Sequence, residues 1–367
     1  MTQRLRLCYV ADAGSPHVQK WAGHFALEHD VHVVSFRPGS IPRARVHVLA
    51  DLPALSKARY PLEAPRLRAL LEHIEPDLVH ALHVTSYGFV AALARARPLV
   101  VSAWGYDILQ APRRTPLHAW MTRFALSQAQ AITATGEALA TATRRFAPAG
   151  RAVHVVPYGI DLDRFAPADD DRGKSTDEAS APIIGSVKAL LPTKGFPYLI
   201  KAMPLILERH PNARLVLIGE GPERPRLDRL IASLRLENHV ELPGELPNSE
   251  VPDQLRCMDV YVQPSLTESF GVSALEASAC GLPVVATDVE GGRDIVRHGE
   301  TGLLVPPGDA RALASAILRL LDDPALAKRM GEAGRRFVRE RYNWPDNAAR
   351  MAAIYNETVE AWRARHR

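Results

Sequence analysis

The chain has 367 residues, of which 47% are hydrophobic, and a formal net charge of +4. This length predicts two domains of ordinary size, and the apolar content is sufficient for two cores. No run of residues approaches the ~20 consecutive apolar positions that a membrane-spanning helix needs. The three cysteines, Cys8, Cys257 and Cys280, are few and odd in number and lie in apolar contexts. They disfavour a disulfide framework and predict buried thiols in a reducing cytoplasm.

Positive charge is concentrated in the first half of the chain. Residues 1–165 hold 19 Lys and Arg against 12 Asp and Glu, whereas residues 182–344 hold 20 against 21. This excess of positive charge could attract nucleic acid, an anionic membrane or a phosphorylated acceptor. We expect no nucleic-acid partner, because the chain lacks a zinc spacing, a recognition helix and a basic motif interleaved with aromatic residues. Two explanations of the basic first half stay open. The charge could bind the inner face of the membrane peripherally, or it could be ordinary surface charge without a partner.

In chain order, short runs rich in valine, isoleucine and leucine alternate with helical patterns. The runs of the first half are 5–10, 31–35, 77–81, 98–102, 131–134 and 153–156. Continuous apolar runs are typical of strands that are buried on both faces of a parallel sheet. Their alternation with helices predicts a doubly wound, Rossmann-like α/β domain over residues 1–165.

The polar stretch 166–182 breaks this rhythm and predicts a linker, in which the acidic run 169–171 is expected to be solvated rather than to bind metal. Further runs at 183–187, 213–218, 259–263 and 283–286 predict a second Rossmann-like domain over residues 183–344. Residues 345–367 carry an apolar stripe at helical spacing. Two such domains are expected to face each other across a cleft, which is a common place for a ligand.

The most informative loop follows the run 259–263. Glu268, Ser269, Phe270 and Gly271 lead from this strand into a predicted helix that contains Glu276. The first backbone N–H groups of a helix have no partner within it and carry partial positive charge, so they suit a phosphate group. Gly271 allows a ligand to approach the backbone closely. The sequence therefore predicts an anion site here, with Glu276 placed to accept hydrogen bonds from ribose hydroxyls.

The full stretch 264–296 reads PSLTESFGVSALEASACGLPVVATDVEGGRDIV. With GEGPERPRL (219–227), PGELP (243–247) and GETGLLVPPGD (299–309), it resembles the large retaining glycosyltransferase family commonly numbered four, the glycosyl transferases group one. The resemblance covers nearly the whole second half and continues more loosely through PDLVHALH (76–83) and VPYGIDLDRF (156–165). It implies the α/β GT-B fold and retaining transfer of a hexose from a nucleoside-diphosphate sugar. The donor would be bound by the second domain and the acceptor by the first, with residues 345–367 packed back onto the first domain.

The resemblance also implies roles for individual residues. Glu268 would contact the donor sugar and Glu276 the ribose, and the backbone from Ser269 to Val272 would hold phosphate and sugar hydroxyls. The donor-binding residues expected in this way are Lys188, Lys194, Gly219, Glu245, Ser269, Phe270, Gly271, Val272, Leu275, Glu276 and Gly14. The catalytic candidates are Glu268 and Asp107.

Two of the seven lysines, Lys188 and Lys194, fall within IGSVKALLPTKGF (184–196). The family typically places an arginine and a lysine here, both facing the donor diphosphate. Lys194 matches the lysine, but Ala189 stands at the arginine position, with Lys188 beside it. Whether Lys188 replaces the arginine stays open, because an ammonium is a point charge and cannot form the bidentate fork of a guanidinium. The alternative is two solvated surface lysines.

In the first domain, candidates follow the strand runs. Gly14 lies in the loop after the first run, and His17 begins the next helix. Asp107 is a candidate for acceptor activation or for contact with the donor sugar, although Trp104 stands where the family often has a histidine. His80 and His83 are expected to be packed, hydrogen-bonded histidines rather than catalytic ones.

These features predict a mechanism without a metal or other cofactor. The lysines and the helix N-terminus would stabilise the charge that develops on the leaving diphosphate. Asp161 and Asp163 are spaced like a metal site but are expected to make a turn. Partners would be a UDP- or GDP-linked sugar and a glycan or lipid-linked acceptor, in the synthesis of cell-surface polysaccharide or glycoconjugate. The alternative is a GT-B protein that binds nucleotide-sugar for another activity, either an epimerase or a non-catalytic binder.

Overall fold

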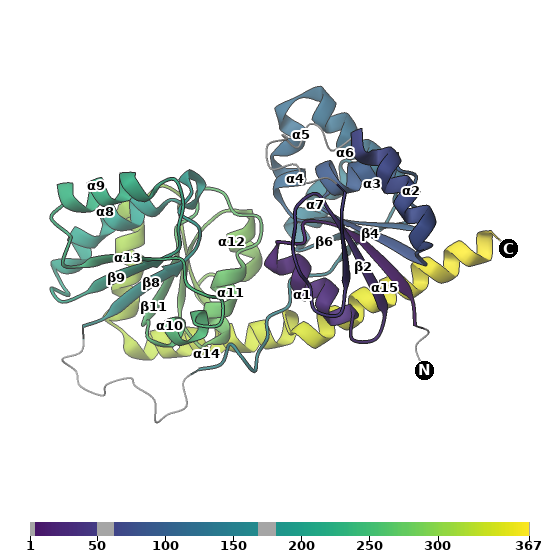
Figure 1. Ribbon diagram of the computed structural model, residues 1–367. Coiled ribbons are helices and arrows are strands. Elements are labelled where there is room, and N and C mark those ends of the chain that lie inside the picture. Colours follow the sequence, from purple (N-terminus) through teal and green to yellow (C-terminus); the bar gives the residue numbers. More distant parts are fainter. Residues whose placement is uncertain (1–3, 50–61, 168–180, 367) are drawn as a thin grey trace. The chain divides into compact units, whose positions relative to one another are not determined.

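The computed structural model describes residues 4–49, 62–167 and 181–366 and divides into two compact units (Figure 1). Unit 1 comprises residues 1–158 and 345–367, and unit 2 comprises residues 159–344. Most of the expected linker, including the acidic run 169–171, lies outside the described residues. In the described part of the chain, no helix has both the length and the hydropathy needed to cross a membrane.

Unit 1 is built around a seven-stranded parallel sheet in the order β3-β2-β1-β4-β5-β6-β7. Its strands are β1 (Arg6–Val10), β2 (Asp30–Ser35), β3 (Arg45–Val48), β4 (Leu78–Leu82), β5 (Leu99–Ala103), β6 (Ala131–Ala134) and β7 (Val153–Val155). Its helices are α1 (Pro16–Phe25), α2 (Ala64–Ile74), α3 (Phe89–Leu93), α4 (Tyr106–Leu109), α5 (Ala111–Arg114), α6 (Pro116–Gln128), α7 (Glu137–Arg144) and most of α15 (Trp344–Arg365), with a π-helical turn at Val84–Gly88.

Helices cover both faces of this sheet, which explains why its central strands β4, β5 and β6 are buried along their whole length. Buried residues of α2, α3, α6 and α7 form one core with alternate residues of the strands, such as Cys8 and Val10. On the other face, Tyr9 contacts α15 through a hydrogen bond of 3.0 Å between its hydroxyl and that of Tyr355. Tyr355 is also 2.6 Å from His80 Nδ1, and Arg363 of α15 donates to Asp77 at 2.6 Å. The last helix is therefore held in unit 1 by buried polar contacts as well as by its apolar stripe.

Unit 2 has a six-stranded parallel sheet in the order β10-β9-β8-β11-β12-β13. Its strands are β8 (Ile183–Val187), β9 (Arg214–Ile218), β10 (Val240–Gly244), β11 (Val260–Gln263), β12 (Val284–Thr287) and β13 (Gly302–Val305). Its helices are α8 (Phe196–Leu207), α9 (Arg224–Ser233), α10 (Val251–Arg256), α11 (Val272–Ala279), α12 (Glu290–Ile295), α13 (Ala310–Leu321) and α14 (Pro324–Arg341), with a 3-10 turn at Pro192–Lys194.

The structure corrects the expected boundary of the first half. Residues 159–165, assigned to the first domain from the sequence, belong to unit 2. Ile160 pairs with Asn343 in an isolated bridge, and its N–H donates to Tyr342 O at 2.6 Å. These backbone contacts fasten the segment to the end of α14 rather than to the first sheet.

Two further expectations were wrong. Three strands, β3, β10 and β13, were not expected from the sequence, and each lies at the edge of its sheet. β3 has no buried residue and β10 is buried only at its two ends, so the apolar pattern of both is weak. β13 is mostly buried but only four residues long. Cys8 and Cys280 are buried as expected, but Cys257 is exposed because it follows directly on the last turn of α10.

Candidate functional site

The strand order of unit 2 reverses between β8 and β11, which are parallel neighbours. In open α/β sheets, ligands bind outside the carboxyl ends of the strands at such a reversal. Lys188 follows directly on β8, and Glu268 lies in the loop after β11. Two residues 80 positions apart in the chain are thus brought together at the point of the sheet that is best suited to a ligand.

The ammonium groups of Lys188 and Lys194 both donate to Glu268 Oε2, Lys194 at 3.1 Å. Ser265 Oγ donates to the same oxygen at 3.1 Å. Only 7% of the Glu268 side chain and 9% of the Lys188 side chain are exposed, so this is a buried ionic cluster. Two ammonium groups on one carboxylate leave a net charge of +1.

The cluster shifts the pKa of its members in opposite directions. Burial raises the pKa of Glu268, but Lys188 and Lys194 outweigh this effect and lower it from 4.5 to about 2. Burial lowers the pKa of Lys188, which Glu268 partly opposes and Lys194 reinforces. Glu276 also raises the pKa of Lys188, which places the second glutamate within the electrostatic field of the cluster.

Glycines hold the lysine-bearing segment 188–195 tightly in place. A Cβ atom on Gly219 would lie 2.0 Å from the carbonyl oxygen of Lys188, and one on Gly195 would lie 2.0 Å from that of Pro264. Lys188 N–H donates to Ile218 O at 2.9 Å. Because both contacts are with backbone atoms, only glycine allows this approach at either position. The positions of Lys188 and Lys194 are therefore determined by the packing of neighbouring strand ends.

The helix expected after the loop of Glu268 is present as α11, Val272–Ala279, which has eight residues and is preceded by Gly271. Gly271 has φ +94°, and a Cβ atom there would lie 2.7 Å from Gln263 Oε1. Gln263 is fully buried at the end of β11, and within the described residues neither atom of its side-chain amide has a hydrogen-bond partner. An unpaired buried amide is costly, so this feature marks the loop as a place for polar contacts.

The remaining candidates of unit 2 are not equally accessible. Phe270 is 2% exposed and packs edge-on against Tyr342, so only its backbone is available to a ligand. The Leu275 side chain is fully buried. Ser269, Val272 and Glu276 are partly exposed along the loop and the first turns of α11, and Glu245 is exposed directly after β10.

Asp107 of unit 1 is fully buried, and its carboxylate binds backbone groups. Its Oδ2 accepts from Val84 N–H at 2.7 Å, and its Oδ1 accepts from Gly105 N–H at 2.8 Å and from Trp104 N–H at 3.1 Å. This geometry favours a positioning role, in which Asp107 holds the loops that follow β4 and β5. Its direct catalytic role stays a prediction. Gly14 is exposed in the loop after β1, where its N–H donates to Asp12 Oδ1 at 3.0 Å.

Three histidines of unit 1, His17, His80 and His83, contact neighbouring side chains. His17 stacks on Tyr158 with ring centroids 4.4 Å apart, and burial lowers its pKa to about 4. Burial lowers the pKa of His80 to about 3, and its Nε2 lies 2.7 Å from Ser102 Oγ. His83 Nδ1 is 2.9 Å from Ser86 Oγ. His80 and His83 each have a hydrogen-bond partner within unit 1, as expected from the sequence, and His80 is fully buried.

Comparison with known proteins identifies the family. Residues 168–337 match the family model of the glycosyl transferases group 1, and residues 6–136 match that of the glycosyl transferase 4-like proteins. A GDP-mannose-dependent alpha-(1-6)-phosphatidylinositol monomannoside mannosyltransferase of Mycolicibacterium smegmatis is 31% identical over 83% of this chain and 82% of its own. The chain belongs to the group 1 glycosyltransferases.

Solved structures agree on the fold. Sucrose-phosphate synthase of Thermosynechococcus elongatus has a TM-score of 0.84 and 26% identity over 98% of this chain and all of its own. HepE of Anabaena, solved with UDP and glucose, has a TM-score of 0.80 and 22% identity over 96% of this chain and all of its own. The glycosyltransferase thus has two Rossmann-like units of the GT-B type.

Two residues that support the site of this glycosyltransferase were not singled out from the sequence. Ser265 adds a third hydrogen bond to Glu268 Oε2. Gly291 N–H donates to Glu268 O at 3.0 Å, and a Cβ atom on Gly291 would lie 2.6 Å from Phe270 N. The signal for Gly291 was the pair of glycines after β12, but only the fold shows that it abuts the loop of Glu268. Asp161, by contrast, makes the expected turn, in which its carboxylate accepts from the N–H groups of Asp163 and Arg164.

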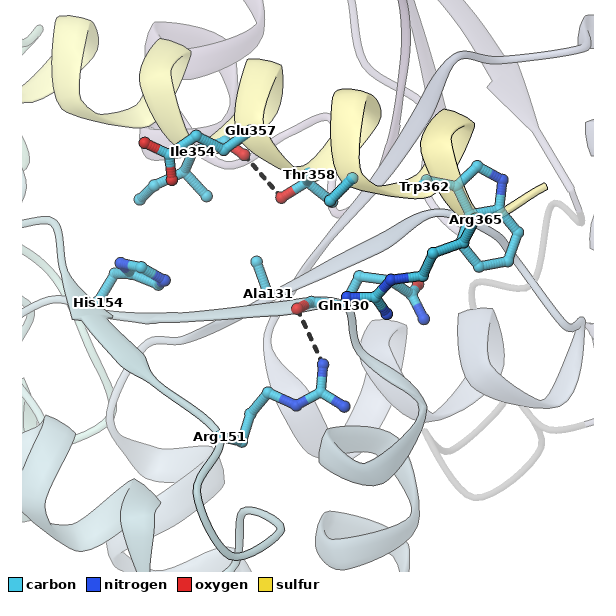
Figure 2. Close-up of a pocket in the computed structure, with 10 residues that line it drawn as sticks. Gln130, Ala131, Arg151, His154, Ile354, Glu357, Thr358, Trp362 and Arg365 are labelled. Atoms are coloured by element: carbon cyan, nitrogen blue, oxygen red, sulfur yellow. Dashed lines mark hydrogen bonds between the residues drawn. The ribbon is translucent and has the colours of Figure 1, made fainter. Parts of the chain in front are cut away.

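A pocket of about 220 Å³ lies elsewhere, between α15 and the amino ends of β6 and β7 in unit 1 (Figure 2). Its lining residues are Gln130, Ala131, Arg151, His154, Ile354, Glu357, Thr358, Ala361, Trp362 and Arg365. Arg151 donates to Gln130 O at 3.0 Å across its floor. The candidate residues follow the carboxyl ends of strands, whereas this pocket lies at the amino ends. It is therefore not the predicted site.

Replacing Asp107 with asparagine is expected to destabilise the glycosyltransferase by about 2–3 kcal/mol, because the new NH₂ group would oppose a backbone N–H in a buried place. Urea unfolding monitored by circular dichroism measures this cost. The control is Asp309→Asn: Asp309 is exposed and caps α13 by accepting from Arg311 N–H and Ala312 N–H, and asparagine caps helices equally well. Equal and small losses in both variants would contradict the positioning role.

Proposed function

We propose that this glycosyltransferase transfers a hexose, with retention of anomeric configuration, from a UDP- or GDP-linked donor to a glycan or lipid-linked acceptor. The observation that carries the proposal is the convergence of Lys188 and Lys194 on Glu268 at the strand-order reversal of unit 2, with a net positive charge. An ammonium has three donors, so each lysine can bind a phosphate oxygen while it holds Glu268. The N-terminus of α11 adds backbone donors to the same anion site.

The proposed chemistry is stabilisation of charge. As the bond between the anomeric carbon and the diphosphate breaks, negative charge develops on the leaving phosphate and the sugar becomes oxocarbenium-like. Lys188, Lys194 and the amides before α11 would bind that developing charge in a buried site, where electrostatic interactions are strong. Glu268 would hold both cations in position and contact the sugar. Retention would follow either from a covalent intermediate or from attack on the face that the leaving group vacates, which the family resemblance favours.

The relatives support the choice of donor and acceptor. The Mycolicibacterium smegmatis relative is named for GDP-mannose and a phosphatidylinositol mannoside. A second relative, 32% identical over 66% of this chain and 64% of its own, is named as a 2-deoxystreptamine glucosyltransferase of Streptomyces kanamyceticus. We favour a lipid-linked acceptor in cell-surface glycoconjugate synthesis, because the first half of the chain is basic.

Glu276→Ala tests the donor site. Loss of a hydrogen bond to a charged group is expected to weaken donor binding by about 10- to 100-fold. Thermal stabilisation by a panel of UDP- and GDP-sugars, followed by assays of donor hydrolysis, measures this effect. Glu237→Ala is the control, since Glu237 is exposed before β10 at the opposite edge of the sheet.

Stabilisation of the wild type by a nucleotide-sugar without any hydrolysis or transfer would favour the non-catalytic alternative. Equal donor binding by both variants would remove Glu276 from the site. The anomeric coupling constant of the product, measured by NMR, decides between retention and inversion.

A further inference from the structure

Helices α5 and α6 of unit 1 carry large apolar side chains on the outside of the protein. Leu117 is 61% exposed and Trp120 is 52% exposed. They are one helical turn apart on α6 and therefore lie on the same face. Trp120 packs edge-on against Phe89 and stacks on Phe124 at 5.5 Å, so its inner half is anchored while its outer half faces solvent. An anchored, half-exposed indole is suited to an interface between water and an apolar phase.

Three exposed arginines flank this apolar pair along the chain. Arg113 and Arg114 lie at the end of α5, and Arg123 lies one turn beyond Trp120. Residues 108–136 contain no Asp or Glu. Among the residues that the structure describes, no carboxylate forms an ion pair with any of these three arginines, whereas Arg66 and Arg68 of α2 are paired with Glu63 and Glu72. The five residues Arg113, Arg114, Leu117, Trp120 and Arg123, here called the α5–α6 surface, thus combine exposed apolar groups with uncompensated positive charge.

The place of this surface in the fold suits a role in acceptor delivery. Helices α4 and α5 follow the carboxyl end of β5, as do Trp104 and Asp107. Figure 1 shows α4 and α5 at the end of unit 1 that lies away from α15, so the last helix does not cover them. A lipid headgroup bound near this end would lie on the same edge of the sheet as the candidate residues of unit 1.

We propose that the α5–α6 surface docks on an anionic lipid bilayer, with Leu117 and Trp120 inserted among the headgroups and the arginines bound to lipid phosphates. The charge complementarity and the paired apolar side chains are the two signals that stable peripheral binding requires. The inference deepens the proposed function, on which it rests for the lipid-linked acceptor, but vesicle binding is measured without any donor or acceptor.

The test is co-sedimentation of the protein with vesicles of phosphatidylcholine alone and of phosphatidylcholine mixed with phosphatidylglycerol. Binding is expected only to the anionic vesicles and is expected to fall as added salt shortens the screening length. Each arginine near the surface is expected to contribute about fivefold, so Arg113→Gln with Arg114→Gln should weaken binding by about 25-fold. Leu117→Ala with Trp120→Ala should weaken it at least tenfold.

Matched controls come from the same unit. Arg66→Gln with Arg68→Gln removes the same charge from arginines that are already paired, and Leu27→Ala removes an equally exposed apolar side chain (58%) from a different helix end. Both controls should bind vesicles like the wild type. Thermal melting and donor hydrolysis of every variant show whether fold and active site are intact, which separates a failure of docking from a failure of the proposed function.

Three results would overturn the proposal. The wild type could bind neither kind of vesicle, or bind both equally at any salt concentration. The control arginines could matter as much as those of the α5–α6 surface. Finally, Leu117→Ala with Trp120→Ala could convert a dimer into a monomer without any change in vesicle binding, which would assign the surface to a second copy of the chain.

Discussion

Replacing Glu268 with glutamine is expected to reduce sugar transfer by about 100-fold or more. The same change should leave the binding of the nucleoside diphosphate alone unchanged or make it tighter. Glutamine removes the negative charge that lies between Lys188 and Lys194, so the net charge of the cluster rises from +1 to +2. A diphosphate is attracted more strongly by the greater charge, whereas the proposed contact between the carboxylate of Glu268 and the donor sugar is lost. Calorimetric titration with UDP and GDP, beside steady-state kinetics, separates the two effects.

The stability of the same variant reports on the ionic cluster. Breaking a buried ion pair by removing one partner costs about 3–5 kcal/mol, and we expect the lower end because glutamine retains an acceptor oxygen. Glu241→Gln is the control, since Glu241 pairs with Arg214 on the surface and is 48% exposed. Such exposed pairs contribute about 0–1 kcal/mol. A loss of diphosphate affinity together with normal turnover would contradict the proposed role of Glu268.

The contribution of the Glu268 carboxylate to the free energy of unfolding should decrease as the pH falls. The pKa of Glu268 is lowered in the folded protein, to about 2 from 4.5. A carboxylate of this kind stabilises the folded state fully above its unfolded pKa, and the contribution is lost as the pH falls toward the folded value. The difference in unfolding free energy between wild type and Glu268→Gln should therefore be constant above about pH 4.5 and shrink below it. Urea titrations at a series of pH values measure this difference.

Gly219→Ala is expected to destabilise unit 2 by about 3 kcal/mol or more and to weaken donor binding at least tenfold. Gly219 has φ +144°, and the added Cβ atom would lie 2.0 Å from the carbonyl oxygen of Lys188. The clash is with backbone, so a side-chain rotation cannot relieve it and the end of β8 must move. A displacement of about 1 Å in a binding group can cost on the order of 100-fold in rate. Urea unfolding and titration with donor measure the two effects.

Gly299→Ala is the control for Gly219→Ala, because it adds the same methyl group without a steric clash. Gly299 also belongs to unit 2 and has φ +81°, but a Cβ atom there would meet nothing within 4 Å. This control should lose only about 1 kcal/mol, the cost of a left-handed conformation in a residue with a side chain. If both variants were equally stable and bound donor equally well, the close packing of Gly219 on Lys188 would have no part in positioning the lysine.

Much of the local structure around the candidate donor site was predictable from local pattern. The sequence placed Glu268, Gly271 and Glu276 correctly on a loop and helix after a strand, because an apolar run followed by glycine and a helical pattern is a local signal. It also marked Lys188 and Lys194 as unusual in a chain with seven lysines. The contact of both lysines with one oxygen of Glu268 could not be foreseen, since the interval of 80 residues between Lys188 and Glu268 is closed only by the pairing of β8 with β11.

For Asp107 and Trp120 too, the sequence could not show which distant segments they contact. Asp107 was a catalytic candidate because it follows a strand, and only the fold shows that Val84 N–H, 23 residues away, occupies one of its oxygens. Leu117 and Trp120 were not singled out from the sequence, and their exposure depends on which face of α6 packs against the rest of unit 1.

Composition and periodicity by themselves determined two α/β units, the central strands of each sheet and the loops that carry glutamate, glycine and lysine, because these are properties of neighbouring residues. Tertiary structure alone decided the edge strands, the boundary at residue 158, the burial of Asp107 and the ionic cluster at Glu268. Each of these depends on which distant segments pack together, and the free energy of that packing is a property of the whole fold rather than of any stretch of sequence.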